Sequence, residues 1–218
     1  MADTIRTIAS LQSLLADNTT GEISPQDLRD MLVSLSNIYQ ESYTTGWEDM
    51  TAPMNSVKLA GVSDPTFSAF QPTGTGSLKA YSFAKGNEVF LTFHTLHNIK
   101  PNSTAYIHVH WTTNGTNTGT VAWDLSWSMA KGHNQQAFPA PTSITVSQAA
   151  SGTAFKHMVT EDATGITITE PDELLIVRLA RNNTATDTCT NTVFGLQVDF
   201  HYQVDRNSTK NRTPDFYA

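Results

Sequence analysis

The stretch YIHVHW at residues 106–111 and the stretch VDFHY at residues 198–202 decide the fold class of this chain. In both stretches an apolar residue alternates with a histidine, an aspartate or a tyrosine. Successive side chains of a β-strand point to opposite faces of a sheet, so this period of two predicts two strands. We expect them to belong to a β-sandwich and to share a half-buried polar face.

Strand-like segments continue through most of the chain from about residue 56. Turn sequences rich in Gly, Asn, Asp and Pro separate them, as at residues 85–87 and 162–165. The predicted strands are residues 56–60, 77–84, 88–96, 104–112, 120–130, 143–148, 154–160, 166–169, 173–181 and 192–204. Because no helical pattern interrupts them, we predict an all-β fold, an antiparallel jelly-roll-like β-sandwich spanning residues 51–218.

Residues 1–50 have a helical pattern instead. Apolar residues recur at helical spacing from Ile5 to Leu15, and a second helix is predicted to start with Ser24 as N-cap, Pro25 in the first turn and Asp27 as a capping acid. That helix runs to about residue 39 or 41 and carries an apolar stripe. The stripe consists of Leu28, Met31, Leu32, Leu35 and Ile38. We predict a short helical N-terminal arm for attachment or trimerisation; folding of the stripe back onto the β-domain remains the alternative.

Charge and composition narrow the class of partner. The net charge is −7, and Lys and Arg are scattered along the chain. Nucleic-acid-binding proteins usually carry a basic stripe, so no nucleic-acid partner is expected. No apolar run approaches the ~20 residues of a membrane span, and the first residues lack the pattern of a signal peptide. We therefore expect synthesis in a cytoplasm and no membrane partner. The single cysteine, Cys189, lies in a polar turn-like stretch and is predicted to be an inert thiol.

The pair His108 and His110 is the first candidate for a metal site. In cupin-type metalloenzymes a His-x-His pair is followed within a few residues by a glutamate, but residues 111–115 contain no acid. His201 could supply a third ligand if its strand lay beside that of His108. Imidazoles without a carboxylate make a weak site for iron or zinc. We therefore predict no metal and no cofactor, and a structural polar cluster of His108, His110, Asp199, His201 and Tyr202.

Two catalytic arrangements can be drawn from the sequence. His94 or His97 could join Asp199 and a serine in a hydrolase triad, but no nucleophile elbow supports this. Asp124 and Asp199 could form a carboxylate pair for glycoside cleavage, but nothing in the sequence brings them together. No catalytic residue is predicted, and the chain is not expected to be an enzyme.

Three tryptophans offer a possible binding surface. Trp123 and Trp127 fall on one face of a predicted strand, and Trp111 lies opposite the histidines of its strand. Exposed indole rings can stack on sugars, which would make a glycan-binding surface. The other interpretation is that they fill the sandwich core or a subunit interface.

Three parts of the chain together resemble tailed-bacteriophage virion jelly-roll proteins. Residues 16–30 resemble the N-terminal segment of such proteins, and the HxHW pattern of residues 108–111 resembles one of their strands. Residues 175–181, 187–188 and 198–202 resemble their closing strands. The family's DxHY pattern maps onto Asp199, His201 and Tyr202.

The resemblance implies a homotrimer on the virion and offers no catalytic residues to carry over. We predict a capsid decoration, or cement, protein whose partners are its own copies and the major capsid protein. The alternative is a tail-fibre or receptor-binding protein whose partners are tail proteins and host glycans.

Overall fold

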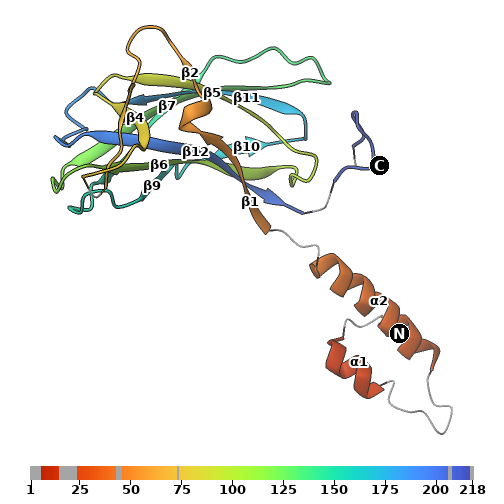
Figure 1. Ribbon diagram of the computed structural model, residues 1–218. Coiled ribbons are helices and arrows are strands. Elements are labelled where there is room, and N and C mark those ends of the chain that lie inside the picture. The colour runs from red at the N-terminus through yellow and green to blue at the C-terminus, as the bar shows by residue number, and fades with distance from the viewer. Residues whose placement is uncertain (1–5, 15–23, 43–45, 73, 206–207, 217–218) are drawn as a thin grey trace. The chain divides into compact units, whose positions relative to one another are not determined.

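The computed structural model describes residues 6–14, 24–42, 46–72, 74–205 and 208–216. The chain divides into two compact units, a helical unit (Met1–Thr45) and a β-unit (Gly46–Ala218), shown in Figure 1. In the β-unit the strands pair into two antiparallel sheets. The predicted all-β sandwich with a helical N-terminal arm is confirmed.

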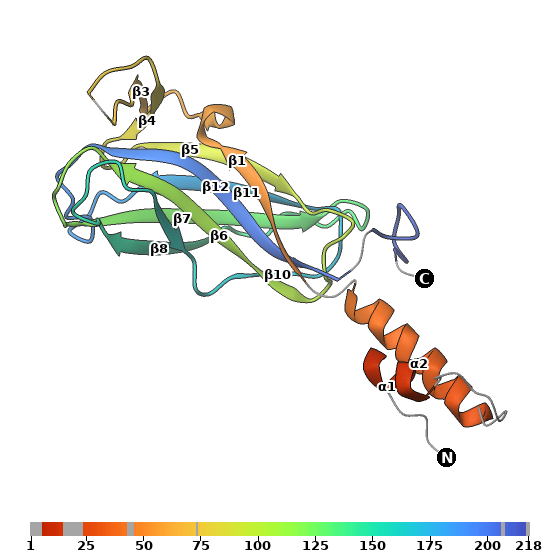
Figure 2. The ribbon, with the colours of Figure 1, turned by 60° about the horizontal axis from the view of Figure 1, so that its bottom comes forward.

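The first sheet contains seven strands, with the path β10-β6-β12-β4-β3; β1 also pairs with β12, and β9 with β6. Their bounds are β1 (Gly46–Pro53), β3 (Thr66–Ala69), β4 (Lys79–Phe83), β6 (Ser103–Thr113), β9 (Met158–Glu161), β10 (Ile166–Ile168) and β12 (Val193–Val204). The two stretches that predicted the fold are direct neighbours, with Val109 opposite Val198 and Ile107 opposite Phe200. Figure 2 shows β6, β12 and β1 side by side.

The second sheet has five strands in the order β2-β5-β11-β7-β8. Their bounds are β2 (Lys58–Leu59), β5 (Glu88–His94), β7 (Thr120–Lys131), β8 (Thr142–Ala149) and β11 (Glu173–Arg181). A 3-10 turn, η1 (Met54–Ser56), leads from β1 in the first sheet towards β2 in the second. Every predicted strand segment overlaps a strand of the structure, although the strand predicted at 154–160 begins only at Met158 and ends at Glu161.

The inner faces of the two sheets supply the core. On β6 and β12 the alternation is as predicted, with Ile107, Val109 and Phe200 fully buried. The second sheet contributes inward-facing side chains of β7 and β11 to the same core. These are Trp123, Leu125, Leu175, Val177 and Leu179. Cys189 is also buried in this core, in agreement with its interpretation as an inert thiol.

Two strands were not predicted, and one of them moves the domain boundary. Strand β1 begins at Gly46, so residues 46–50, assigned to the arm from the sequence, belong to the sandwich. Glu, Asp and Pro are depleted in strands, and the sequence GWEDMTAP therefore has little strand propensity of its own. Pairing of all eight residues of β1 with residues 197–204 of β12 decides the conformation of β1. Strand β3, the other missed strand, has four residues and pairs with β4.

The helical unit contains α1 (Ile8–Leu14) and α2 (Pro25–Ser42). The predicted start of α2 is confirmed: the Ser24 hydroxyl accepts a hydrogen bond from the backbone N–H of Asp27 at 3.2 Å, and the Asp27 carboxylate accepts one from the N–H of Ser24 at 2.9 Å. These reciprocal bonds satisfy two backbone donors at the helix start. Residues 1–5, including Ile5 of the first predicted pattern, lie outside the described residues.

The buried face of α2 is polar and its apolar stripe faces outward. Asp30 and Ser34 are buried, and the Arg6 guanidinium donates to Asp30 Oδ2 at 2.8 Å while the Arg6 N–H donates to Ser34 Oγ at 2.8 Å. Three members of the predicted stripe are exposed and two are half-buried. Their exposed fractions are Leu28 49%, Leu32 63% and Leu35 50%, and the half-buried members are Met31 and Ile38. A surface helix of a globular protein usually buries its apolar stripe, whereas within the described helical unit the stripe of α2 is left largely uncovered.

Candidate functional site

The predicted polar cluster lies on the outer face of the first sheet. Asp199 of β12 is directly opposite His108 of β6, and Asp49 of β1 is directly opposite His201 of β12. His110 follows His108 on the same face of β6. The structure therefore brings together four of the five predicted residues, His108, His110, Asp199 and His201.

Aromatic rings stack along this face. The imidazole of His201 stacks on the indole of Trp47 and on the imidazole of His108, with 4.8 Å between ring centroids in both pairs. His110 stacks on His157 at 5.0 Å. We call His201, His108, His110 and His157 the histidine row. Because the stacked rings restrict one another's orientation, the four histidines form a continuous arrangement on the sheet and are not independent surface side chains.

Each of the three strand histidines in this row lies beside a carboxylate. Asp49 Oδ1 is 2.5 Å from Nδ1 of His201, and Glu161 Oε2 is 2.5 Å from Nε2 of His108. Asp199 Oδ2 is 2.8 Å from Nε2 of His110, but the atoms are out of line for a hydrogen bond, and this nitrogen has no hydrogen-bond partner in the described part of the chain. The other nitrogen of His110 lies 2.8 Å from His157 Nε2. Imidazole and carboxylate are the side chains that bind divalent metal ions and exchange protons.

Tyr202, the fifth predicted residue, lies on the other face of β12. It is buried at the edge of the core, and its hydroxyl donates a hydrogen bond to Glu48 Oε2 at 3.0 Å. The prediction that it joins the histidines is wrong because residue 202 alternates with residue 201. Burial, followed by the hydrogen bond to the Glu48 carboxylate, raises the pKa of Tyr202 to about 12.

The raised pKa of Tyr202 predicts a loss of stability in alkali. A tyrosine that ionises less readily in the folded chain contributes stability that is complete below pH ~10 and is lost as the pH rises towards about 12. Replacement by phenylalanine should flatten the dependence of the free energy of unfolding on pH in this window. Urea titrations of both chains between pH 9 and 12 would measure it; equal slopes would contradict the assignment.

The residues that complete the histidine row could not be found from the sequence. Trp47 and Asp49 lie in β1, which has little strand propensity, and Glu161 and His157 lie 50 or so residues from their partners in β6. Pairing of β9 with β6 brings Glu161 opposite His108, and His157, which comes directly before β9, reaches His110 at the end of the same pairing. No spacing within the sequence indicates these contacts.

A second histidine cluster surrounds one carboxylate elsewhere in the β-unit. The Nε2 atoms of His94, His97 and His133 lie 3.4, 3.2 and 3.0 Å from oxygens of Asp172. His94 and His97 were considered with Asp199 as a hydrolase triad, and the structure pairs them with Asp172 instead. His97 also contacts Thr209, its Nδ1 lying 2.6 Å from the hydroxyl oxygen.

The carboxylate pair considered for glycoside cleavage is not formed. Asp124 projects from the outer face of the second sheet, where its carboxylate accepts hydrogen bonds from Thr145 and Asn182. Asp199 projects from the outer face of the first sheet. The sandwich core separates the two side chains, because their strands belong to different sheets.

The three tryptophans considered as a glycan surface are core residues. Trp111 and Trp123 have no exposed area, and Trp127 is 8% exposed. The interpretation as core filling is the correct one for all three. Trp111 also donates a hydrogen bond from Nε1 to Thr160 Oγ1 at 2.8 Å. The remaining tryptophan, Trp47, is 46% exposed and belongs to the histidine row's surface.

The outer face of the second sheet carries an open apolar groove of about 400 Å³. Its lining includes Phe90 of β5, Ile176 of β11, and Phe138 and Pro139 of the loop after β7.

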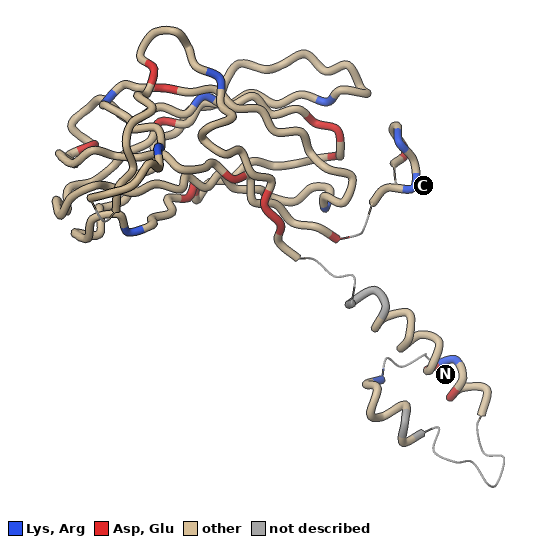
Figure 3. Tube along the Cα trace, in the orientation of Figure 1, with Lys and Arg blue, Asp and Glu red and all other residues tan. Residues whose placement is uncertain are grey.

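Figure 3 shows the positions of Lys and Arg spread along the described part of the chain, with two of them, Lys210 and Arg212, near its C-terminal end. No described helix has the length and apolar character needed to cross a membrane.

Comparisons with known proteins give no family. No family model and no curated protein matches the chain. Among solved structures it is similar to the insecticidal delta-endotoxin Cry8Ea1 from Bacillus thuringiensis, with a TM-score of 0.41 and 11% identity over 72% of this chain and 24% of the toxin chain. It is also similar to a CBM35 from Cellvibrio japonicus Abf62, with a TM-score of 0.38 and 16% identity over 69% of this chain and 92% of that one. A family 6 carbohydrate-binding module from Clostridium cellulolyticum gives a TM-score of 0.36 and 9% identity over 69% of this chain and 95% of that one. These scores are too low to carry binding or activity over to this chain.

Proposed function

We propose that this chain is a structural protein of a bacteriophage particle, a homotrimeric decoration protein that binds and stabilises the head shell. In this proposal the helical unit is the assembly element and the sandwich is the rigid body that it carries. No catalytic role is assigned to either unit.

The outward-facing leucine stripe of α2 is the observation that carries the proposal. Leu28, Leu32 and Leu35 are each about half exposed. On the opposite face of the same helix Asp30 and Ser34 are buried and accept hydrogen bonds from Arg6. Full burial of a leucine is worth roughly 1.5–3 kcal/mol. If the stripes of three copies packed against one another, the free energy gained by burying these leucines would exceed the cost of ordering them. That cost is about 0.5–1 kcal/mol for each leucine.

The resemblance of the chain to virion jelly-roll proteins supports the same function. The residues that carry it on β6 and β12 form one continuous pair of strands. A tail-fibre or receptor-binding protein remains the alternative within the same class of particle, with an arm that anchors it to the tail. Its predicted glycan surface loses support because Trp111, Trp123 and Trp127 lie in the core.

Removal of the arm tests the proposal. A chain that starts at Gly46 keeps every described strand and should show the circular dichroism and melting temperature of the folded sandwich. We expect its binding to particles that lack the protein to fall by at least about 100-fold, since loss of the stripe removes more than about 2.7 kcal/mol. The full chain is the control. A folded, truncated chain that binds particles as well as the full chain would overturn the role of the arm.

A further inference from the structure

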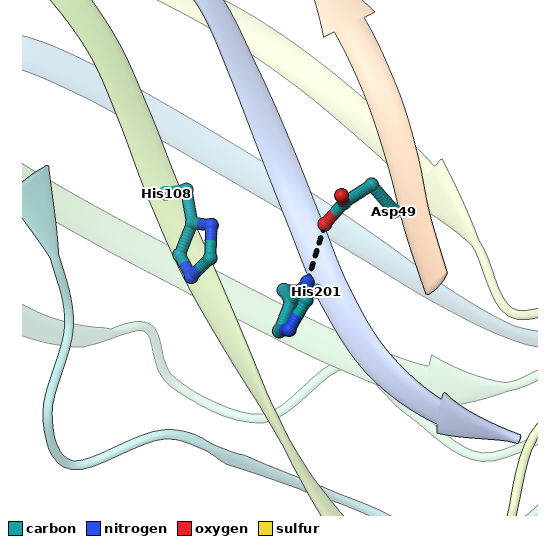
Figure 4. A group of neighbouring side chains, drawn as sticks. All are labelled: Asp49, His108 and His201. Atoms are coloured by element: carbon teal, nitrogen blue, oxygen red, sulfur yellow. Dashed lines mark hydrogen bonds and ion pairs between the residues drawn. The ribbon is translucent and has the colours of Figure 1, made fainter. Parts of the chain in front are cut away.

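We propose that Asp49, His108 and His201 form a binding site for a divalent transition-metal ion of the zinc class. Figure 4 shows the three side chains on neighbouring strands, with Asp49 on β1, His201 on β12 and His108 on β6. One ligand atom from each of the three lies within 4.8 Å of the other two. Two imidazoles and one carboxylate are a donor set that zinc, cobalt, nickel and iron accept.

The sheet itself sets the spacing of these donors. Asp49 and His201 are directly opposite each other, and His108 is the diagonal neighbour of His201 because it pairs with Asp199 two residues away. Opposite and diagonal side chains on one face of a sheet lie within reach of each other. The three donors therefore come from backbone that is fixed by hydrogen bonds, and small rotations of side chains are enough to close them around an ion.

Glu161 strengthens the case for His108 as a ligand. Its carboxylate lies 2.5 Å from Nε2 of His108, which leaves Nδ1 as the nitrogen free to bind an ion. In Figure 4 one ring nitrogen of His108 lies on the side that faces His201 and Asp49. Metal-binding histidines are commonly held in this way by a carboxylate on the other ring nitrogen, which fixes the ring and raises its basicity.

The ion must replace one short contact. His201 Nδ1 and Asp49 Oδ1 are 2.5 Å apart, whereas two ligands of a tetrahedral ion are about 3.3 Å apart at metal–ligand distances of ~2.0–2.1 Å. Binding therefore opens this hydrogen bond, releases its proton and turns the two stacked rings towards one point. The side chains of Asp49 and His201 are 45% and 26% exposed, so an ion can enter from solvent and keep water on its open positions.

The proposed ion would link three strands across the face of the sheet. It would hold β1, the first strand of the sandwich, to β12 and β6 through side chains in addition to the backbone ladder. Trp47 stacks on His201 with 3° between the ring planes, so its fluorescence should report the binding of an ion to His201. The other three tryptophans are in the core and should respond little.

Titration of the metal-free full chain with Zn²⁺ in a calorimeter and with Co²⁺ in a fluorimeter tests the site. We expect saturable binding of one zinc ion that is lost in His108→Ala and His201→Ala, and quenching by cobalt that disappears in Trp47→Phe while zinc binding stays. Removal of a carboxylate partner of a ligating histidine typically costs 10–100-fold in affinity, so Glu161→Gln should bind about tenfold or more weakly. Asp49→Asn keeps the shape of the side chain but removes the charge of a direct ligand, so it should weaken binding more than Glu161→Gln does.

His133→Ala is the matched control, because it removes a histidine beside the distant carboxylate of Asp172. It should leave the cobalt quenching of Trp47 unchanged. Circular dichroism of each variant shows whether the sandwich is folded. Absence of saturable zinc binding by the native chain would overturn the proposal. Native affinity in folded Asp49→Asn and His201→Ala variants would overturn it as well.

Discussion

Replacement of Asp187 by alanine is expected to lower the free energy of unfolding by about 3–5 kcal/mol. The Asp187 side chain is fully buried and forms a bidentate ion pair with Arg181, with Nε to Oδ2 and Nη2 to Oδ1 distances of 2.9 Å. Its Oδ2 also accepts from the backbone N–H of Ala122 at 3.2 Å. Loss of the carboxylate would leave the buried guanidinium of Arg181 without its partner charge.

The position of this ion pair explains the size of the effect. Arg181 ends β11 and also donates to the carbonyl oxygens of Phe83 and Cys189, so its guanidinium ties the end of one strand to β4 and to the loop before β12. Lys85 contacts Asp187 as well. Removal of Asp187 would therefore weaken the contacts of Arg181 that link β11 of the second sheet to β4 of the first sheet.

The pair Arg178 and Glu88 supplies the control for Asp187→Ala. It is also an arginine–carboxylate pair on β11, with 2.5 Å between Nε and Oε2, but the arginine side chain is 39% exposed. Exposed ion pairs contribute about 0–1 kcal/mol, so Glu88→Ala should have a small effect. Urea unfolding of both variants measures the difference. Equal losses in the two variants would show that the buried pair does not hold the sandwich together.

Replacement of Leu28, Leu32 and Leu35 together by glutamine is expected to convert the proposed trimer into monomers. Because each of the three side chains is about half exposed, their burial would otherwise contribute about 2–4 kcal/mol for each copy in the proposed assembly. Glutamine has nearly the helix propensity of leucine, so α2 itself should be preserved. Sedimentation equilibrium gives the molecular mass in solution and circular dichroism the helix content.

A matched triple variant on the sandwich separates the stripe from surface hydrophobicity in general. Val62, Leu78 and Leu96 are exposed by 71%, 65% and 44%, and their replacement by glutamine should leave the proposed trimer intact. A trimer that survives the arm substitutions would contradict the role of the stripe. A native chain that is monomeric, with a sandwich that loses stability in the arm variant, would favour the alternative in which the stripe folds back.

The sequence predicts the sandwich well because the strongest strands carry their own periodicity. In the central part of β6 the inward positions 105, 107, 109 and 111 are apolar, and in β12 so are Val198 and Phe200. The fold class and the outward face of His108 and His201 therefore follow from alternation alone. The start of α2 was equally predictable, since Ser24 and Asp27 form a local capping pair. These features depend on residues that are close in sequence.

The histidine row was only partly predictable because its other members depend on pairing between distant strands. Asp49 and His201 are 152 residues apart, and β1 acquires its conformation from β12 rather than from its own residues. No acid lies within a few residues after His108 in the sequence, and its carboxylate partner Glu161 comes from β9, 53 residues away. Tyr202 belongs to the same DxHY pattern as Asp199 and His201, but its side chain lies on the opposite face of β12, so the pattern alone does not place it with the histidines.

Cryo-electron microscopy of the native particle tests the central proposal most directly, by showing where the chain sits and in how many copies. We predict trimers repeated over the capsid lattice, with the helical units in contact at the threefold axis or with the shell. Particles that lack the chain, or that carry it only in a few copies at the tail, would contradict a decoration protein.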